Sequence, residues 1–158
     1  MFCSECTGLQ APAVVWSEKH SNSYKVSNLL KNDNKIWFSP NEYIGHGFTL
    51  KLDSCRVNIA GIRLKNTCNT HCNRATRAFR IQGILKDGGP WVHLLAGELE
   101  KPEKASAPAP AVQKLYFNET VEVQFLRFDL DSFWGDSGGL NFFQVIPVPG
   151  NLIVTEYL

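Results

Sequence analysis

The last third of the chain constrains the fold most, because its apolar residues recur with a period of two. Residues 121–130 begin V-E-V-Q-F, the alternation of a strand with one buried and one solvated face. Residues 115–117 and 140–146 are further apolar runs of strand length. Between them, residues 134–139 read W-G-D-S-G-G, which is too rich in glycine for the interior of a helix or strand. This segment predicts a turn between two strands.

The same pattern recurs earlier in the chain and predicts strands over residues 48–53, 57–64, 78–85 and 91–95. Gly61 interrupts the second of these strands, where a glycine commonly marks a bulge. Residues 98–112 have no apolar period and predict a long surface loop, and residues 26–31 predict a single helical turn. Roughly eight short strands with polar turns predict an all-β protein. We expect an eight-stranded antiparallel β-sandwich, a jelly roll, forming one domain over residues 1–158 with its core at about 14–147.

Charge and hydropathy exclude two classes of partner. Sixteen basic and fifteen acidic side chains leave a net charge of +1, so no overall field attracts nucleic acid or an anionic membrane. No apolar run reaches the roughly 20 residues that span a bilayer. Residues 1–10 lack the basic start and apolar stretch of a signal peptide. We therefore expect a protein that stays inside the cell or a chain that has been trimmed.

The five cysteines leave three alternatives open. Cys3, Cys6, Cys68 and Cys72 have the residue type and number of a four-thiolate zinc site, although the two pairs lie far apart in the sequence. One or two disulfides, or free thiols, are compatible with the same sequence. Asn118 begins a glycosylation sequon, N-E-T, which has meaning only in a secreted protein.

Three segments, taken in order, resemble the discoidin family, also called the coagulation factor V/VIII type C domain, a galactose-binding-like jelly roll. The first is W-S-E at 16–18 with S-N-L-L-K-N-D at 27–33 and I-W-F at 36–38. The second is G-I-R-L-K-N-T at 61–67 with N-R-A-T-R-A-F-R-I-Q-G at 73–83. The third is L-R-F at 126–128 with W-G at 134–135 and G-G-L-N-F-F at 138–143. The resemblance covers about residues 14–147.

This resemblance implies a binding module without catalysis, whose loops at one end hold sugars, phospholipid headgroups or protein partners. It also implies an extracellular location. Many sugar-binding relatives hold a structural calcium, and Asn32 and Asp33 occupy the matching opening turn. Their closing strand carries a glutamate, where this chain reads Phe143-Gln144. The calcium site thus lacks a carboxylate that an ion with six to eight oxygen ligands would use.

The loop over residues 66–77 is the first candidate ligand site. It concentrates amide, hydroxyl, imidazole and guanidinium groups, of which we single out His71, Asn73, Arg74 and Arg77. The planar fork of arginine suits diols and carboxylates, and the resemblance implies an asparagine and an arginine here, matching Asn73 and Arg74. The alternative is that Arg74 and Thr76 only support the turn.

Trp134 and Asp136 are the second candidate. An aromatic ring beside a carboxylate is a sugar-binding pair, because sugar C–H groups stack on the ring while the carboxylate accepts from hydroxyls. Alternatively, Trp134 closes the end of the sandwich and Asp136 caps a turn. The G-D-S-G-G motif at 135–139 is also found around serine-protease nucleophiles, but the chain lacks the histidine context and the length of that fold.

The sequence therefore predicts a non-catalytic binding module for a glycan or glycoprotein, in which oligomerisation would add avidity. The alternative is an intracellular protein–protein interaction module of the same fold, an assembly or adaptor subunit. The absent signal peptide and the odd number of cysteines favour that alternative.

Overall fold

The computed structural model describes residues 12–19, 21–31, 35–68, 73–86, 88–102 and 111–148. Short strands dominate these ranges, and two 3₁₀ turns precede the second strand. The elements, in chain order, are β1 Ala13–Ser17, η1 Asn22–Tyr24, η2 Val26–Leu30, β2 Trp37–Phe38, β3 Gly45–Lys51, β4 Val57–Lys65, β5 Arg74–Thr76, β6 Ala78–Ile84, β7 Trp91–Glu98, β8 Gln113–Val123, β9 Phe125–Leu130, β10 Phe133–Gly135, β11 Gly139–Leu140 and β12 Phe142–Pro147.

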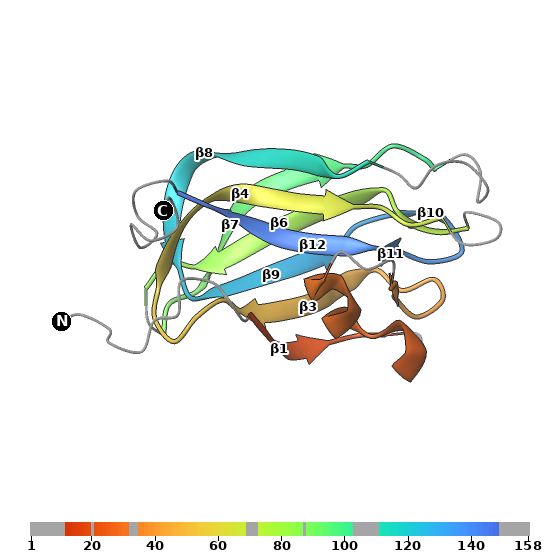
Figure 1. Ribbon diagram of the computed structural model, residues 1–158, viewed down its shortest axis with the longest axis horizontal. Coiled ribbons are helices and arrows are strands. Elements are labelled where there is room, and N and C mark those ends of the chain that lie inside the picture. The colour runs from red at the N-terminus through yellow and green to blue at the C-terminus, as the bar shows by residue number, and fades with distance from the viewer. Residues whose placement is uncertain are drawn as a thin grey trace.

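Two antiparallel sheets face each other and confirm the predicted β-sandwich (Figure 1). One has five strands in the order β1-β3-β9-β6-β7, and the other has three in the order β12-β4-β8. Two short ribbons, β10–β5 and β11–β2, complete the arrangement. In Figure 1, β10 and β11 lie at one end of the sandwich, and the connections from β3 to β4 and from β8 to β9 lie at the other.

Aromatic rings fill the space between the sheets. Phe48 of β3 and Phe128 of β9 stack with their centroids 4.8 Å apart and a 3° angle between planes. Phe143 of β12, on the opposite sheet, meets Phe48 edge-on at 5.3 Å. Trp37 of β2 meets Phe48 edge-on at 5.4 Å, and its Nε1 donates to the Glu18 carbonyl at 2.8 Å. Offset-stacked and edge-on arrangements are the favoured ones for such rings, so one cluster holds both layers together.

Two sequence predictions about strand boundaries were wrong. Residues 121–130 are not one strand, because β8 ends at Val123 and β9 begins at Phe125 in the other sheet. The alternation changes phase at Gln124: Val123 is buried on β8, whereas Leu126 and Phe128 are buried on β9. Residues 134–139 are not a simple turn, because they contain the end of β10 and the start of β11. Their glycines allow close strand approach: a Cβ at Gly139 would lie 2.6 Å from the Arg74 carbonyl oxygen.

The predicted bulge at Gly61 is confirmed. The register of β4 against both neighbours shifts between Ile59 and Gly61, and Gly61 lies opposite Tyr116 of β8. A Cβ placed on Gly61 would lie 2.2 Å from the Leu115 carbonyl oxygen and 2.8 Å from the Tyr116 Cα. The backbone of β8 therefore approaches β4 closely at a position that only glycine fits.

We expect Gly61→Ala to lower the free energy of unfolding by about 1–3 kcal/mol, because the new methyl group must displace the β8 backbone. Gly88→Ala is the comparison, since a Cβ at Gly88 meets nothing within 4 Å and only its φ of +70° is unfavourable. Its cost should be about 1–2 kcal/mol or less. Urea unfolding of both variants measures the difference. A smaller loss for Gly61→Ala than for Gly88→Ala would contradict this account of the bulge.

Candidate functional site

The loops at the β10–β11 end bring together three of the predicted site residues. Asn73, which precedes β5, donates from Nδ2 to Asp136 Oδ2 at 3.0 Å. Arg74 donates from its guanidinium to Ser137 Oγ, also at 3.0 Å. The Asn73–Asp136 bond is exposed, whereas Ser137 is fully buried. An amide, a guanidinium and a carboxylate thus meet at this end of the sandwich, and we call Asn73, Arg74 and Asp136 the loop-end cluster.

Backbone contacts hold the loop-end cluster in place. The Asp136 N–H donates to the Asn73 carbonyl at 2.7 Å, and β10 pairs with β5 in the register Trp134↔Ala75 and Gly135↔Arg74. Gly135 has a φ of +92°, and a Cβ there would lie 2.5 Å from the Asn73 Cα. Glycine is thus required for the polypeptide to pass this point and present Asp136 beside Asn73.

Buried side chains anchor β5 from beneath. Asn66 donates to the Thr76 carbonyl at 2.9 Å and accepts from the Thr76 N–H at 3.1 Å. Thr76 in turn donates from Oγ1 to the Gly139 carbonyl at 2.8 Å. Asn66 and Thr76 are almost fully buried. Thr76 thus bonds to a backbone carbonyl and supports this turn, as the structural alternative expects. Arg74 differs, because its guanidinium bonds to the side-chain hydroxyl of Ser137.

Trp134 and Arg77 form a separate pair. Successive side chains of a strand point to opposite faces, so Trp134 lies on the other side of the β10–β5 ribbon from Arg74. The Arg77 guanidinium lies 4.5 Å from the centroid of the Trp134 ring and is 3.3 Å from the Glu98 carboxylate. Trp134 Nε1 donates to the Leu99 carbonyl at 3.1 Å. Arg77 thus occupies one face of the Trp134 ring.

Glu42 is a neighbour of the loop-end cluster that the sequence did not reveal. Its N–H donates to the Asp136 carbonyl at 2.8 Å, and its φ is +60°, which is unusual for a residue other than glycine. The Tyr43 N–H donates to the Pro40 carbonyl at 3.2 Å and closes the turn that contains Glu42. Such backbone strain is found at functional sites more often than elsewhere. The Pro-Asn sequence at 40–41 signals the turn but not its contact with Asp136.

A shallow hollow beside η1 and η2 continues from this end. Arg74 lies 5.5 Å from the ring centroid of Phe38, and Phe38 packs against Tyr24 with centroids 4.4 Å apart. The hollow has a volume of about 490 Å³, and its lining combines polar and apolar groups of Asn22, Ser23, Tyr24, Lys25, Asn28, Lys35 and Ile36. Amide, hydroxyl and ring groups of this kind suit a polyhydroxylated ligand.

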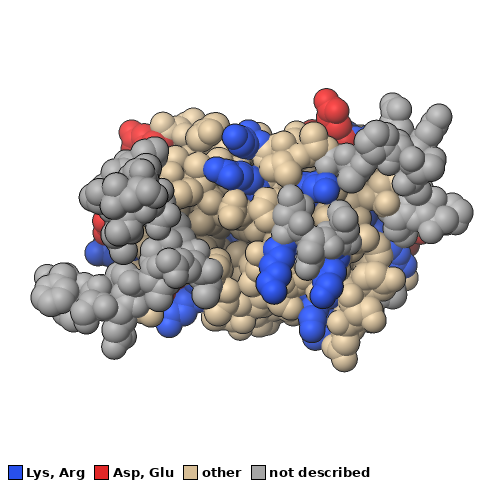
Figure 2. Space-filling view, in the orientation of Figure 1, with Lys and Arg blue, Asp and Glu red and all other residues tan. Residues whose placement is uncertain are grey.

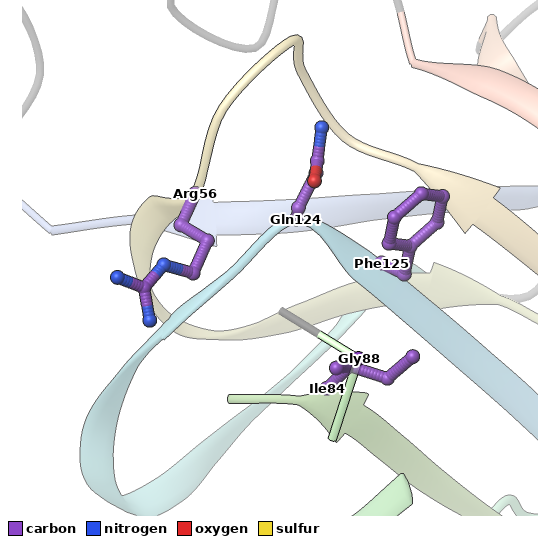
Figure 3. A pocket seen from close by; sticks show the side chains of 5 residues that line it. All are labelled: Arg56, Ile84, Gly88, Gln124 and Phe125. Atoms are coloured by element: carbon purple, nitrogen blue, oxygen red, sulfur yellow. The ribbon is translucent and has the colours of Figure 1, made fainter. Parts of the chain in front are cut away.

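A second pocket, of about 190 Å³, lies at the opposite end of the sandwich. Figure 3 shows its five lining residues, Arg56, Ile84, Gly88, Gln124 and Phe125. The guanidinium of Arg56 and the amide of Gln124 point away from each other in this view. Arg56 donates to the Leu85 carbonyl at 2.7 Å, and Gln124 donates to the Asp53 carbonyl at 3.2 Å. The polar groups do not converge on a ligand position, so this pocket is the weaker candidate.

Trp16 and His46 form an aromatic pair on the rim of the five-stranded sheet. Their rings stack with centroids 3.9 Å apart, and Trp16 is 43% exposed. His46 Nε2 lies 2.6 Å from Thr49 Oγ1. Burial, followed by the nearby Arg127 cation, lowers the pKa of His46 below its usual value, and Asp129 opposes this change. Trp16 therefore lies at the rim of the sheet, with part of its ring open to solvent.

The remaining predicted site residues lie outside the described ranges: His71, the calcium candidates Asn32 and Asp33, and Cys3, Cys6 and Cys72. Cys55 and Cys68 are both disulfide-bonded. A sulfur in a disulfide offers no thiolate to a metal, which favours the disulfide alternative for Cys68 over zinc and over a free thiol. Among the described residues, no group of three His, Cys, Asp or Glu side chains is placed to hold a metal ion.

The fold is shared with carbohydrate-binding modules. A family 32 module from a family 31 glycoside hydrolase of Clostridium perfringens superimposes with a TM-score of 0.68 and 16% identity, covering 87% of this chain and 95% of that one. The family 32 module of NanJ from the same organism, in complex with galactose, gives 0.66 and 12%, covering 89% and 97%. CpGH89CBM32-5, also from Clostridium perfringens and in complex with GalNAc-β-1,3-galactose, gives 0.64 and 13%, covering 86% and 94%.

These similar structures are discoidin-like jelly rolls of the galactose-binding type, so the predicted fold is confirmed. No family model matches the sequence, and no curated protein matches it either. At these identities the comparison shows the fold alone. Within the part of the chain that the structure describes, no helix is long and apolar enough to cross a membrane.

We expect Asn66→Ala to lower the free energy of unfolding by about 2–4 kcal/mol, because it leaves the buried N–H and carbonyl of Thr76 without partners. Asn58→Ala is the matched control on β4, where the half-buried side chain makes no hydrogen bond. Thermal and urea unfolding measure both variants. Equal losses in the two variants would show that Asn66 does not anchor β5.

The lowered pKa of His46 predicts a loss of stability as the pH falls. Since the unfolded chain binds the proton more readily, the contribution of His46 is fully present above about pH 6.5 and is lost as the pH falls below it. We expect the free energy of unfolding to fall more between pH 7.5 and 5.5 in the wild type than in His46→Gln. His93→Gln, at an exposed position of β7, controls for the loss of an imidazole. The same fall in wild type and His46→Gln would refute the prediction.

Proposed function

We propose that this chain is a carbohydrate-binding module that holds a neutral glycan at the β10–β11 end. The observation that carries the proposal is the loop-end cluster, where Asn73, Arg74 and Asp136 present donors and an acceptor together. Sugar hydroxyls both donate and accept, so a site of this composition pairs with vicinal hydroxyls. The shared fold supports the proposal, since two of the similar structures are complexes with galactose or a galactose-containing disaccharide.

In this proposal the residues have distinct roles. The guanidinium of Arg74 keeps donors beyond the one used by Ser137, because it has five N–H groups. Asp136 accepts from a hydroxyl through the oxygen atoms of its exposed carboxylate, and Glu42 adds a second carboxylate from the adjoining turn. Asn73 Oδ1 is buried and has no hydrogen-bond partner, so a small rearrangement of its amide would give a ligand hydroxyl an acceptor. The free face of Trp134 and the cation of Arg77 would contact a longer glycan from the other side of the ribbon.

The chemistry of Ser137 supports a binding role over a catalytic one. Ser137 is fully buried, and its Oγ accepts a hydrogen bond from Arg74 at 3.0 Å. A serine nucleophile requires an adjacent base and access to substrate. Arginine stays protonated and cannot serve as that base, so the G-D-S-G-G motif is explained by the close packing of this turn.

The disulfide-bonded state of Cys55 and Cys68 favours a secreted module over the intracellular adaptor alternative, because disulfides form and persist in oxidising compartments. Asn118, at the start of the sequon, is exposed on β8 and accessible to modification. A glycan or glycoprotein is then the expected partner.

The closing-strand position of the calcium site is Gln144, which lies opposite the Arg63 cation. A nearby cation disfavours a bound divalent ion at that position.

A glycan array with the purified chain, run with calcium and with a chelator, tests the proposal. Hits are then measured by calorimetry with Arg74→Ala, Arg74→Lys and Asp136→Asn. We expect Arg74→Ala to weaken binding at least tenfold, because a hydrogen bond to a charged group contributes about 1.5–3 kcal/mol. Arg74→Lys should fall between wild type and Arg74→Ala, since lysine keeps the charge and loses the planar fork.

Arg56→Ala is the matched control, because it removes an arginine at the opposite end of the sandwich. Unfolding curves for all variants separate a binding role of Arg74 from its contact with Ser137. A folded protein with no hits, or hits that Arg74→Ala and Asp136→Asn both leave unchanged, would refute the site. Capture of a protein partner by a chain with no array hits would support the adaptor alternative.

A further inference from the structure

The outer face of the three-stranded sheet carries a group of cations that form no ion pair with any residue the structure describes. In β4, Ile62 and Leu64 are fully buried, so Arg63 and Lys65 between and after them point outward. Arg63 lies directly opposite Lys114 of β8 on one side and Gln144 of β12 on the other. We call Arg63, Lys65 and Lys114 the basic face. Figure 2 shows Lys and Arg side chains gathered over the middle of the visible surface, with Asp and Glu only near its edges.

The basic face has no internal charge compensation in the described ranges. The ion pairs there involve Arg56, Arg77, Arg80 and Arg127, and none involves Arg63, Lys65 or Lys114. Arg63 Nε is buried and makes no hydrogen bond. Glu122 is the nearest acidic residue of β8 among those paired with β4. It lies opposite Asn58, at the other end of β4, and it forms an ion pair with Arg56 at 3.6 Å.

Two like charges directly opposite each other across strands are unfavourable. The Arg63↔Lys114 pair belongs to this class, since cross-strand neighbours have Cβ atoms about 4.5–5.5 Å apart. Lys65 lies two residues further along the same face, about 6.6–6.8 Å from Arg63 along the strand. A bound anion relieves this repulsion, so three cations within two neighbouring strands form a favourable site for a ligand with more than one negative group.

An exposed aromatic ring extends the basic face. Tyr116 of β8 lies opposite Gly61, which has no side chain, and is 59% exposed. It lies two residues from Lys114, on the same side of the sheet. An open aromatic ring next to cations and the exposed amide of Gln144 is a surface on which a sugar ring stacks while its anionic substituents meet the cations.

We propose that the basic face binds an anionic polysaccharide, with sulfate or carboxylate groups contacting Arg63, Lys65 and Lys114 and a sugar ring contacting Tyr116. This site is distinct from the loop-end cluster and does not depend on the proposed function. Duplex DNA fits less well, because the net charge of the whole chain is only +1. In addition, the basic face is the flat surface of a sheet and has no helix or ribbon that could enter a groove of the duplex. An anionic membrane fits less well, because the exposed ring is a single tyrosine rather than an apolar anchor.

The experiment is calorimetry of the folded chain with a heparin-derived oligosaccharide at several NaCl concentrations. By the counterion-release argument developed for nucleic acids, three neutralised charges predict a slope of log K against log salt between about −2 and −3. A triple variant, Arg63→Gln with Lys65→Gln and Lys114→Gln, should lose at least tenfold in affinity. The control triple variant, Lys51→Gln with Lys86→Gln and Lys101→Gln, changes the net charge equally on other surfaces and should stay within twofold of wild type.

Tyr116→Ala tests the sugar contact separately. It should weaken oligosaccharide binding about three- to tenfold and leave the salt slope unchanged, because it removes no charge. A fully desulfated oligosaccharide should bind much more weakly than the sulfated one. Arg56→Ala, which removes a cation at the end of the sandwich opposite the loop-end cluster, should leave this binding unchanged.

Several results would overturn the proposal. Equal losses in the two triple variants would show that only net charge matters. Tighter binding to a DNA duplex than to the oligosaccharide, with no effect of Tyr116→Ala, would identify a general polyanion surface. Association with phosphatidylserine vesicles in the absence of oligosaccharide binding would identify a membrane surface.

Discussion

The stacked pair of Phe48 and Phe128 is the contact on which the rest of the structure depends. The two residues lie directly opposite each other on β3 and β9, and Phe79 of β6 extends the stack with a centroid distance of 5.4 Å to Phe128. Phe143 meets these rings from the other sheet. Because the interiors of proteins pack as densely as organic crystals, the position of this stack fixes the distance between the layers.

Between that core and the loop end, hydrogen bonds of buried side chains hold the backbone of β5 and β11 in place. Asn66 holds both backbone groups of Thr76, and Thr76 holds Gly139. Buried polar groups stabilise a structure only when their partners are present, so these residues act as one unit. The exposed bond between Asn73 and Asp136 is the outermost member of that chain of contacts. A ligand that bonds to those two side chains meets groups already held in place, which reduces the entropy lost on binding.

The sequence predicted the layers well and the contacts between distant segments poorly. Alternation revealed the strands, and Gly61 revealed its bulge, because both signals are local. The loop over 66–77 and the segment 134–139 were each predicted as site candidates, and the structure places Asn73 and Arg74 beside Asp136. The contact of Glu42 with Asp136 was not predictable, since it depends on a residue at positive φ and a partner 94 positions away in the numbering (136 minus 42). The Arg63↔Lys114 pair was missed for a related reason. The strand register that pairs these residues depends on the size of the register shift at Gly61, and the sequence does not reveal that size.

The two candidate surfaces differ in how their charges are compensated, and this difference separates their ligands. At the loop end, Arg74 already bonds to Ser137, and Asn73 already bonds to Asp136. The affinity of a ligand there therefore depends on how well its hydroxyl groups match the positions of these donors and acceptors, and little on the ligand's net charge. On the outer face of the three-stranded sheet, Arg63, Lys65 and Lys114 form no ion pair within the described ranges, and a bound anion would reduce their mutual repulsion. Salt weakens exposed charge–charge attraction far more than it weakens hydrogen bonds to an uncharged ligand. A glycan with both a neutral end and acidic groups along its length would therefore engage the two surfaces through different physical forces, and ionic strength alone would distinguish them.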